Sequence, residues 1–524
     1  MQKHNMRTEK KSSIKNSATR LVLIALLVLI QTGWMVFLML KLNAYSTAIT
    51  LTLTFIAVFI ALKIFGTHVN SAQRMPWLIV ITAVPFFGIC IYLLFGRSIV
   101  TKGMRRRFNG IESDILVNKL SQDETVIDEI AAKDKGIANQ CRYISHTARY
   151  PVYKNTDVEY YAEADISFAA QIEELKKAEH FIFMEYHAIE DALSFERLKK
   201  VLIEKAQSGV EVRIFYDDLG SIFFLNKEFI KRMRGQGIQC RVFNPLKVVV
   251  NMFMNNRDHR KITVIDGRVG FTGGYNLADE YFNITHPYGY WKDTGIKLTG
   301  DAVRSLTASF LTMWNAIDHT DSQADYDKYL DAADNTYKAV DSECYVQPYS
   351  DNPLGQDRIG EDVYLNILKN AKDYVYITTP YLIITDEMER ELRLAVKRGV
   401  DVRIVTPGIP DKKMVYKITR SYYEPLCSAG VRIYEYTPGF CHAKQWVSDD
   451  EVSVVGTINM DFRSLYLHFE NAVFTYNKGL AAKVKKDMLN NFEAGREVTK
   501  DYAKDVIRPL KLGTCILRMI SPLL

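Results

Sequence analysis

Three apolar runs open the chain. The first covers residues 21–40, is broken only at 31–33, and is about one bilayer span long. Two runs of similar length follow at 44–62 and 77–95. A cleaved signal peptide has a shorter apolar run and a small-residue cleavage site, and it is not followed at once by two more runs. The pattern therefore predicts an N-terminal membrane region over residues 1–96, built from transmembrane helices.

Basic residues flank this region on both sides. Loops rich in lysine and arginine stay in the cytoplasm, so both flanks are expected there, although three full spans would place them on opposite sides. Either one run is re-entrant or interfacial, or the first basic tail is translocated. We expect the denser second cluster to keep the main domain cytoplasmic and to hold anionic headgroups. The two clusters are Lys3, Arg7, Lys10, Lys11, Lys15 and Arg20, and Arg97, Lys102, Arg105, Arg106 and Arg107.

Beyond a polar connector at 97–150, strand-like and helix-like segments alternate in a pattern that occurs twice. The buried-strand pattern that ends at Tyr186 returns 193 residues later, and so does the strand led by Gly237. Alternating strands and helices predict an α/β fold with a mixed or mostly parallel sheet in each copy. Two copies are too few for a solenoid. We therefore expect domains at 151–335 and 336–500, folded as a pseudo-twofold pair around one shared cleft.

The last segment, 501–524, is amphipathic. It is apolar from Val506 onward but carries Arg508, Lys511 and Arg518. Such a tail either lies in the membrane interface near the mouth of the active site or packs on the domain as a terminal helix.

Composition changes this picture little. A chain of 524 residues requires more than one core. A net charge of +6 is too small to indicate nucleic acid as a partner. The seven cysteines are scattered without CxxC spacing, which favours free thiols in a reducing compartment and gives no zinc site.

The strongest chemical signal occupies the same place in both copies. In each copy a histidine is followed by a lysine two residues later and by an asparagine 17 residues later. Chance is not expected to keep these residue types in register twice. The two sets are His259, Lys261 and Asn276, and His442, Lys444 and Asn459.

Both segments are predicted to be strands, in which residues two apart share a face. The two imidazoles, two ammonium groups and two carboxamides would then line one pocket, which suits an anion with several oxygens. A lysine beside each histidine would repel a dication, and the site has no thiolates, so we expect no metal and no other cofactor.

Four acidic residues accompany the motif. Asp266 and Asp449 each follow their histidine by seven residues. This odd separation puts them on the opposite face of a straight strand, so we assign them to structural support. A further acid is needed to orient each imidazole. Asp293 and Glu470 occupy comparable places in the two copies and are the candidates.

These residues resemble the HxKxxxxD and GxxN motifs of the phospholipase D superfamily, and they do so in both copies. The resemblance extends from about Pro151 to Phe492. Around the motifs the chain is similar to the bacterial cardiolipin synthases in particular, for example in Trp291-Lys-Asp-Thr. Cys441 and Gln445 depart from the pattern, because apolar residues are expected beside the second histidine.

The resemblance implies a phosphatidyltransferase of the bacterial cell membrane. One histidine would attack phosphatidylglycerol to form a phosphohistidine, and the other would protonate the departing glycerol. The roles would then reverse as a second phosphatidylglycerol gives cardiolipin. We expect His259 as nucleophile and His442 as acid and base, with both lysines, Asn276 and Asn459 on the phosphate oxygens. The catalytic residues of the motif are His259, Lys261, Asp266, His442, Lys444 and Asp449.

Other functions share part of this pattern. A hydrolytic phospholipase D, or a transferase that uses serine or ethanolamine, has the same motifs because one phosphohistidine serves water and any alcohol. A nuclease of the same superfamily is disfavoured, because a nucleic-acid substrate does not require three apolar membrane segments. A lipid-binding scaffold on an inactive fold is disfavoured, since both copies keep their histidine and lysine. The sequence carries no signal for an oligomeric state.

Overall fold

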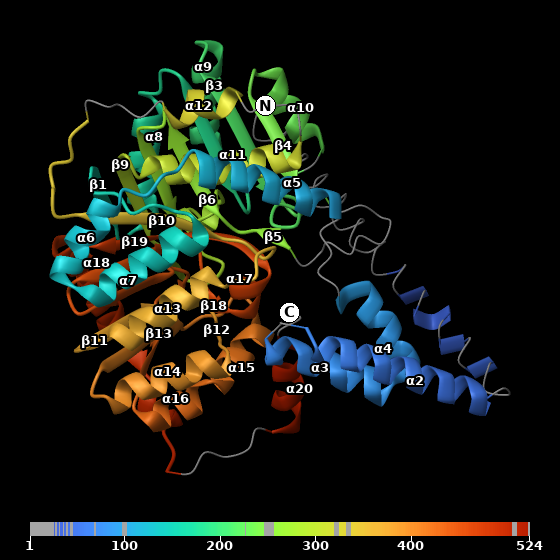
Figure 1. Cartoon of the computed structure of the whole chain (residues 1–524). Coiled ribbons are helices and arrows are strands. Elements are labelled where there is room, and N and C mark those ends of the chain that lie inside the picture. Colours follow the sequence, from blue (N-terminus) through green and yellow to red (C-terminus); the bar gives the residue numbers. More distant parts are fainter. Residues whose placement is uncertain are drawn as a thin grey trace.

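The computed structural model describes residues 46–67, 70–96, 102–225, 227–245, 256–318, 324–331, 337–505 and 511–521, with scattered positions between 26 and 41. Two α/β bodies stand one on the other, and a group of helices projects to one side (Figure 1). Each body is built on its own mixed sheet.

The first sheet has the strand order β1-β9-β7-β6-β2-β3-β4, and the second has β10-β19-β17-β16-β11-β13-β14-β20. The seven strands of the first order match the first seven of the second, and β20 is an additional strand at the edge of the second sheet. In each sheet three strands run parallel, β2-β3-β4 and β11-β13-β14, and the other main strands are antiparallel. The predicted α/β fold with two similar domains is therefore confirmed. The strands are β1 Thr156–Tyr161, β2 Phe181–Tyr186, β3 Glu211–Asp217, β4 Gln239–Phe243, β6 Lys261–Ile265, β7 Val269–Gly273, β9 Gly295–Gly300, β10 Tyr345–Asp351, β11 Tyr374–Thr378, β13 Asp401–Pro407, β14 Arg432–Tyr436, β16 Gln445–Ser448, β17 Val452–Gly456, β19 His468–Tyr476 and β20 Gly495–Glu497.

Strand β2 shows why these segments are continuously apolar. Its residues are all buried, and successive side chains enter different cores. Phe183 stacks on Phe310 of helix α11 (Val303–Ile317), with ring centroids 4.6 Å apart. Ile182 and Met184 belong to the core that helices α8 (Ala164–Leu175) and α9 (Leu193–Gln207) share. Because helices cover both faces of this strand, neither face meets solvent, and apolar and polar residues do not alternate along it.

The helices of the two bodies are α8 Ala164–Leu175, α9 Leu193–Gln207, α10 Lys227–Gly235, α11 Val303–Ile317, α12 Ala324–Leu330, α13 Ile359–Asn370, α14 Asp386–Lys397, α15 Lys413–Ser421, α16 Tyr423–Ala429, α17 Phe462–Tyr466, α18 Lys478–Ala494 and α19 Thr499–Tyr502. Helix α18 contacts the second sheet and also β1 of the first body. The two bodies therefore share helical cover as well as the cleft between them.

The predicted connector is an integral part of the core. It forms helices α5 Lys102–Glu112, α6 Glu124–Lys133 and α7 Lys135–Tyr143, with short π-helical turns at Ser113–Val117 and Ile144–Ala148. Ile115, Ile127 and Ile130 are fully buried in the core that contains residues of both sheets. The polar residues of these helices face outward, so the average composition of the segment is polar although one face of each helix is buried.

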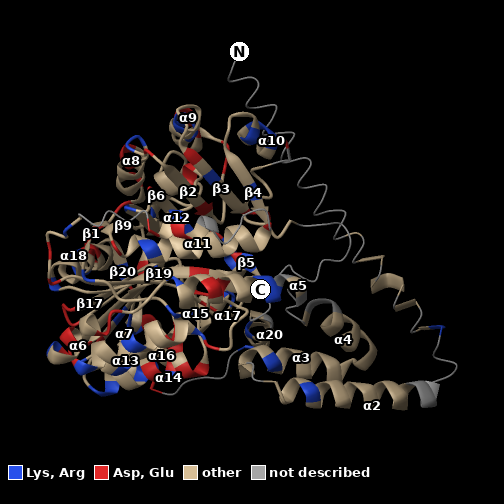
Figure 2. Cartoon of the chain, turned by 45° about the horizontal axis from the view of Figure 1, so that its top comes forward, with Lys and Arg blue, Asp and Glu red and all other residues tan. Residues whose placement is uncertain are grey.

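The N-terminal region folds as helices α2 Ser46–Phe65, α3 Ser71–Ala83 and α4 Pro85–Ile91, followed by a π-helical turn at Tyr92–Gly96. In Figure 2, few residues of these three helices carry the colours of charged residues. Within the described residues, no helix combines the length and the apolar character needed to cross a membrane. Most of the predicted run 21–40 lies outside the described residues.

The third apolar run, 77–95, forms a hairpin of two short helices instead of one continuous helix. The helix stops at Ala83, the extended residue Val84 turns the chain, and α4 folds back on α3. Gly88 permits this hairpin, because a Cβ at this position would lie 2.4 Å from the carbonyl oxygen of Val80. Close approach of two backbones requires a residue without a side chain.

The C-terminal tail forms helix α20 Leu512–Ile520, which contacts α3 and α15. The guanidinium of Arg518 lies 3.7 Å from the centre of the Tyr422 ring. Of the two alternatives for this segment, the described part packs on the protein, while Leu512 and Ile516 stay exposed.

Candidate active site

One cavity of about 590 Å³ lies between the two bodies and takes side chains from both. His259 and Asn276 come from the first copy, and His442 and Asn459 from the second. The predicted shared cleft therefore exists, with both histidines on its wall. Each of these four side chains is at least nine-tenths buried.

Each histidine lies at a break between two strands, and the expectation of continuous strands through the motif is wrong. His259 separates β5 Arg257–Asp258 from β6, and His442 follows β15 Gly439–Cys441. Strands β5 and β15 leave their own sheets and pair with β19 and β8 Tyr290–Lys292 of the other copy. The His259 amide donates to the carbonyl of Phe469 at 2.9 Å, and the His442 amide donates to that of Lys292 at 2.7 Å. The two copies thus hold each other's histidine backbone.

The acids that orient the imidazoles are also exchanged between the copies. Nδ1 of His259 lies 2.9 Å from both carboxylate oxygens of Glu470, and Nδ1 of His442 lies 2.6 Å from Asp293. A carboxylate accepts a hydrogen bond from Nδ1–H and so leaves the Nε2 lone pair available. The predicted residues are in place, but each serves the histidine of the opposite copy.

Both acids are held firmly. Glu470 also accepts hydrogen bonds from the hydroxyls of Thr457 and Ser464, each at 2.5 Å. Burial alone would raise the pKa of Asp293, but the positive charge of Lys444 and the hydrogen bond from His442 lower it overall. Asp293 therefore stays ionised beside its imidazole.

The two lysines lie beneath the cavity rather than among its described lining residues. Each is 1% exposed, and each ammonium donates to the carbonyl of the histidine two residues before it. Burial lowers the pKa of Lys261 to about 7 and that of Lys444 to about 8, although Glu470 and Asp293 oppose the shift. The ammonium charges act on the site from the layer below.

Both imidazoles are neutral at physiological pH in the free protein. Burial and the charges of Lys261 and Lys444 lower the pKa of His259 well below its usual value. Burial and Lys444 lower the pKa of His442 to about 4, and Asp293 partly opposes this shift. Each imidazole also has a carboxylate on Nδ1, Glu470 for His259 and Asp293 for His442, and this carboxylate stabilises the imidazolium that forms during proton transfer.

The two asparagines differ in their partners. Asn276 accepts from the Ala188 amide at 3.2 Å and donates to the Tyr281 hydroxyl at 2.7 Å. The amide oxygen of Asn459 has no hydrogen-bond partner within the described part of the chain, and the residue is 5% exposed. Asn459 thus offers a free acceptor at the cavity wall.

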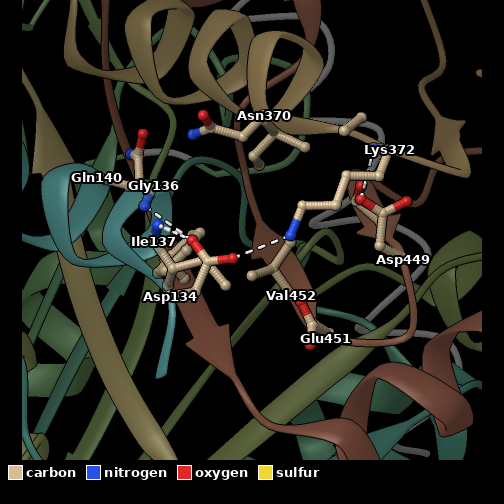
Figure 3. Close-up of a pocket in the computed structure, with 13 residues that line it drawn as sticks. Asp134, Gly136, Ile137, Gln140, Asn370, Lys372, Asp449, Glu451 and Val452 are labelled. Atoms are coloured by element: carbon tan, nitrogen blue, oxygen red, sulfur yellow. Dashed lines mark hydrogen bonds and ion pairs between the residues drawn. The ribbon is translucent and has the colours of Figure 1, made fainter. Parts of the chain in front are cut away.

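Asp266 and Asp449 lie away from the histidine cavity. Each has a left-handed backbone and accepts three amide hydrogen bonds at the start of a central strand. Asp266 receives those of residues 179–181, and Asp449 those of residues 372–374. Figure 3 shows Asp449 on a separate cavity of about 240 Å³. This placement agrees with structural support rather than contact with substrate.

Several residues of the site had no distinct signal in the sequence. The rings of His187 and His468 lie 5.1 and 5.7 Å from that of His259, and the Trp291 ring lies 5.2 Å from that of His442. His468 and Trp291 each stand two residues before an orienting acid, so the repeat could have indicated them. His187 aligns with Pro380 in the second copy, and the repeat could not have found it.

One group of described residues has the donor atoms of a metal site. Ligand atoms of His259, His468 and Glu470 lie within 4.8 Å of one another. The oxygens of Glu470 already accept hydrogen bonds, and Lys261 places a positive charge nearby.

Cys441 and Gln445, where apolar residues were expected, lie beside a buried polar network behind His442. The Lys292 ammonium lies 2.7 Å from the Asp487 carboxylate, which also accepts from the side chains of Gln445 at 2.9 Å and Tyr160 at 2.7 Å. Cys441 pairs with Lys292 between strands β15 and β8. The network connects helix α18 to strand β8, which carries the backbone partner of His442.

Replacing Asp487 with leucine is expected to reduce the free energy of unfolding by about 3–5 kcal/mol, because the change leaves the buried Lys292 without its nearest anion. Urea denaturation of the purified protein measures the loss. The double variant Lys292→Met with Asp487→Leu removes both charges and should recover most of the stability. A single variant as stable as wild type would contradict the importance of this pair.

Comparison with known proteins places the chain among relatives with the same organisation. A family model described as "Cardiolipin synthase, PLD-like domain" matches residues 171–314 and 364–492, and one described as "Phospholipase_D-nuclease N-terminal" matches 52–97. An uncharacterized protein of Streptococcus mutans is 39% identical over 88% of this chain and 99% of its own length. Cardiolipin synthases of Geobacillus thermodenitrificans and Halalkalibacterium halodurans are 34% and 31% identical, over 92% and 94% of this chain and 94% and 95% of theirs.

A solved structure shares the fold. The phosphatidylserine synthase of Haemophilus influenzae superimposes with a TM-score of 0.53 at 15% identity, and the match covers 69% of this chain and 93% of that one.

Proposed function

The chain belongs to the cardiolipin synthase family with phospholipase D-like domains, and from this membership we propose that it transfers a phosphatidyl group from one phosphatidylglycerol to another, giving cardiolipin and glycerol. The observation that carries the proposal is the meeting of His259 and His442 in one cavity, each with an acid on Nδ1. This arrangement leaves two Nε2 atoms for one phosphorus.

In the first half of the reaction, Nε2 of His259 attacks the phosphorus of phosphatidylglycerol. The P–N bond forms, the bond from phosphorus to the glycerol oxygen breaks, and His442 gives its Nε2 proton to that oxygen. The lipid phosphate carries one negative charge, which favours protonation of an imidazole beside it. Following the resemblance of the two motifs to the phospholipase D superfamily, we assign the nucleophile to His259 and the acid role to His442, whose Nδ1 Asp293 contacts.

In the second half, His442 takes the proton of a hydroxyl on another phosphatidylglycerol. The new P–O bond forms, the P–N bond to His259 breaks, and both imidazoles return to their starting states. Lys261 and Lys444 stabilise the negative charge of the phosphate oxygens from below, and the carboxamides of Asn276 and Asn459 contact them from the cavity wall. We keep Asp266 and Asp449 as supports of the motif strands.

The proposed product can be identified directly. Purified protein is incubated with phosphatidylglycerol in detergent, and the lipids are analysed by mass spectrometry. Cardiolipin and free glycerol in equal amounts are the expected products. Phosphatidic acid as the main product would instead indicate hydrolysis.

The rate constant kcat/KM for phosphatidylglycerol is expected to fall as pH rises through about 7 to about 8, where Lys261 and Lys444 lose their protons. Both lysines stabilise the phosphate only when protonated, so the active form is the low-pH form. The phosphodiester keeps its charge throughout this range, and both histidines of the free protein are already neutral. A pH profile of initial rates at low lipid concentration measures the effect. A rate that instead rises through this range would show that loss of a proton activates the site.

The membrane setting is part of the proposal. Runs 21–40 and 44–62 would cross the bilayer, while the α3–α4 hairpin returns to the side from which it started. Two crossings place both basic flanks and the catalytic domain in the cytoplasm, in agreement with the distribution of lysine and arginine. Exposed apolar side chains on α2 and α20 support contact with lipid near the cavity, whose lining includes Ser521 at the end of α20.

A further inference from the structure

Acidic side chains line the histidine cavity on the side of His442. Glu280 precedes Tyr281, whose ring lies 5.4 Å from the His442 ring. Asp411 follows strand β13 and accepts a hydrogen bond from the Tyr381 hydroxyl at 2.6 Å. Glu280, Tyr381 and Asp411 all line the same cavity as the two histidines.

We propose that Glu280, Asp411 and Tyr381 form the subsite that binds the free hydroxyls of glycerol, first as the leaving group and then as the headgroup of the acceptor lipid. The inference rests on the proposed function and names the residues that select the acceptor. In the described part of the chain, the Glu280 carboxylate has no hydrogen-bond or ion-pair partner, and it faces the cavity.

The charge of this wall suits a neutral polyol. Carboxylates accept hydrogen bonds from hydroxyl groups and repel phosphate. Burial, with the negative charges of Glu190 and Asp411, raises the pKa of Glu280 to about 7, so this group can accept from one hydroxyl and donate to another. Lys412 also lines the cavity and lies 3.8 Å from Asp411, so it offsets part of the negative charge of this wall. The lysines of the two motifs supply positive charge for the phosphate from below, and the Glu280 carboxylate, unpaired among the described residues, remains for a hydroxyl group.

A second, independent feature points to a ligand with hydroxyl donors. Asn459 lines the same cavity, is 5% exposed, and carries an amide oxygen with no partner among the described residues. A buried acceptor without a donor is costly, and a bound hydroxyl removes that cost. The side-chain amide nitrogen of Asn459 remains available to donate to the phosphate.

The direction of the reaction places glycerol on this wall. When His259 attacks phosphorus, the leaving oxygen lies opposite the new P–N bond and beside His442. The acceptor hydroxyl must enter at the same position, because it gives its proton to His442 as its oxygen bonds to phosphorus and the P–N bond breaks. One glycerol subsite therefore serves both halves of the reaction and favours an alcohol over water.

The test measures the ratio of cardiolipin to phosphatidic acid formed from phosphatidylglycerol micelles. Glu280→Gln, Asp411→Asn and Tyr381→Phe should each lower this ratio by about 10- to 100-fold, because each weakens the hold on an acceptor hydroxyl. Glu228→Gln, on the exposed face of α10, is the control and should keep the wild-type ratio. Incorporation of deuterated glycerol into phosphatidylglycerol should fall in parallel with the ratio.

The outcomes separate the subsite from the reaction itself. If wild type makes cardiolipin and all three variants keep its ratio within about twofold, the subsite is wrong and the proposed function stands. If wild type makes only phosphatidic acid, both are wrong. Tyr381→Phe removes one hydroxyl and no charge, so it tests the subsite even if a charge variant fails to fold.

Discussion

Replacing His259 with alanine is expected to lower the rate of cardiolipin formation by about five orders of magnitude, since the variant has no nucleophile for phosphorus. Replacing His442 with alanine should cost about 10²- to 10⁴-fold, because that variant loses only proton transfer. Initial rates with phosphatidylglycerol in detergent measure both losses. His146→Ala removes an exposed histidine that pairs with Glu124, and this control should keep full activity.

A substrate with a better leaving group separates the two roles. Phosphatidyl-p-nitrophenol releases an anion that needs no proton, so His442→Ala should release p-nitrophenol at close to the wild-type rate in the first turnover. His259→Ala should remain inactive with this substrate. The reverse pattern would exchange the two assignments, and near-wild-type synthesis by either variant would contradict the two-histidine mechanism.

Exchange of the orienting acids between copies predicts the second large effect. Glu470→Gln and Asp293→Asn should each lower kcat by about 10²- to 10⁴-fold, because an amide no longer holds Nδ1–H and favours the wrong tautomer. Glu470 contacts the proposed nucleophile and Asp293 the proposed acid. The activated substrate should therefore rescue the first turnover of Asp293→Asn and leave Glu470→Gln slow.

This pattern depends on the crossed contacts. If each acid served the histidine of its own copy, Glu470→Gln would be the rescued variant and Asp293→Asn the slow one. Thermal unfolding of both variants provides the control for folding, since Glu470 also accepts from Thr457 and Ser464. A loss of activity that follows loss of folded protein would contradict a role in orienting the imidazoles.

Much of the site could be predicted because duplication made it visible twice. The equal spacing from His259 to Asn276 and from His442 to Asn459 indicated which residues share a pocket. The repeat aligns equivalent positions, but it does not say which copy a side chain contacts. The crossed pairing through β5 and β15 therefore emerged only from the fold.

Other features could not be predicted from the sequence, each for a local structural reason. Side-chain parity applies only while a strand is continuous, and the chain at His259 leaves one pairing partner for another. Apolar content showed 77–95 as a run about one bilayer span long, whereas Val84 and Gly88 allow a hairpin that hydropathy does not detect. His187 is supplied by one copy alone and gave no repeated signal.

The central claim is that the phosphatidyl group passes through a covalent bond to Nε2 of His259. His442→Ala mixed with phosphatidyl-p-nitrophenol should accumulate this intermediate, because its formation needs no acid and its breakdown lacks a base. Peptide mass analysis after alkaline quenching should find one phosphatidyl group on the peptide that contains His259, and acid should release it. Release of p-nitrophenol with no adduct, or an adduct on any other residue, would contradict the account.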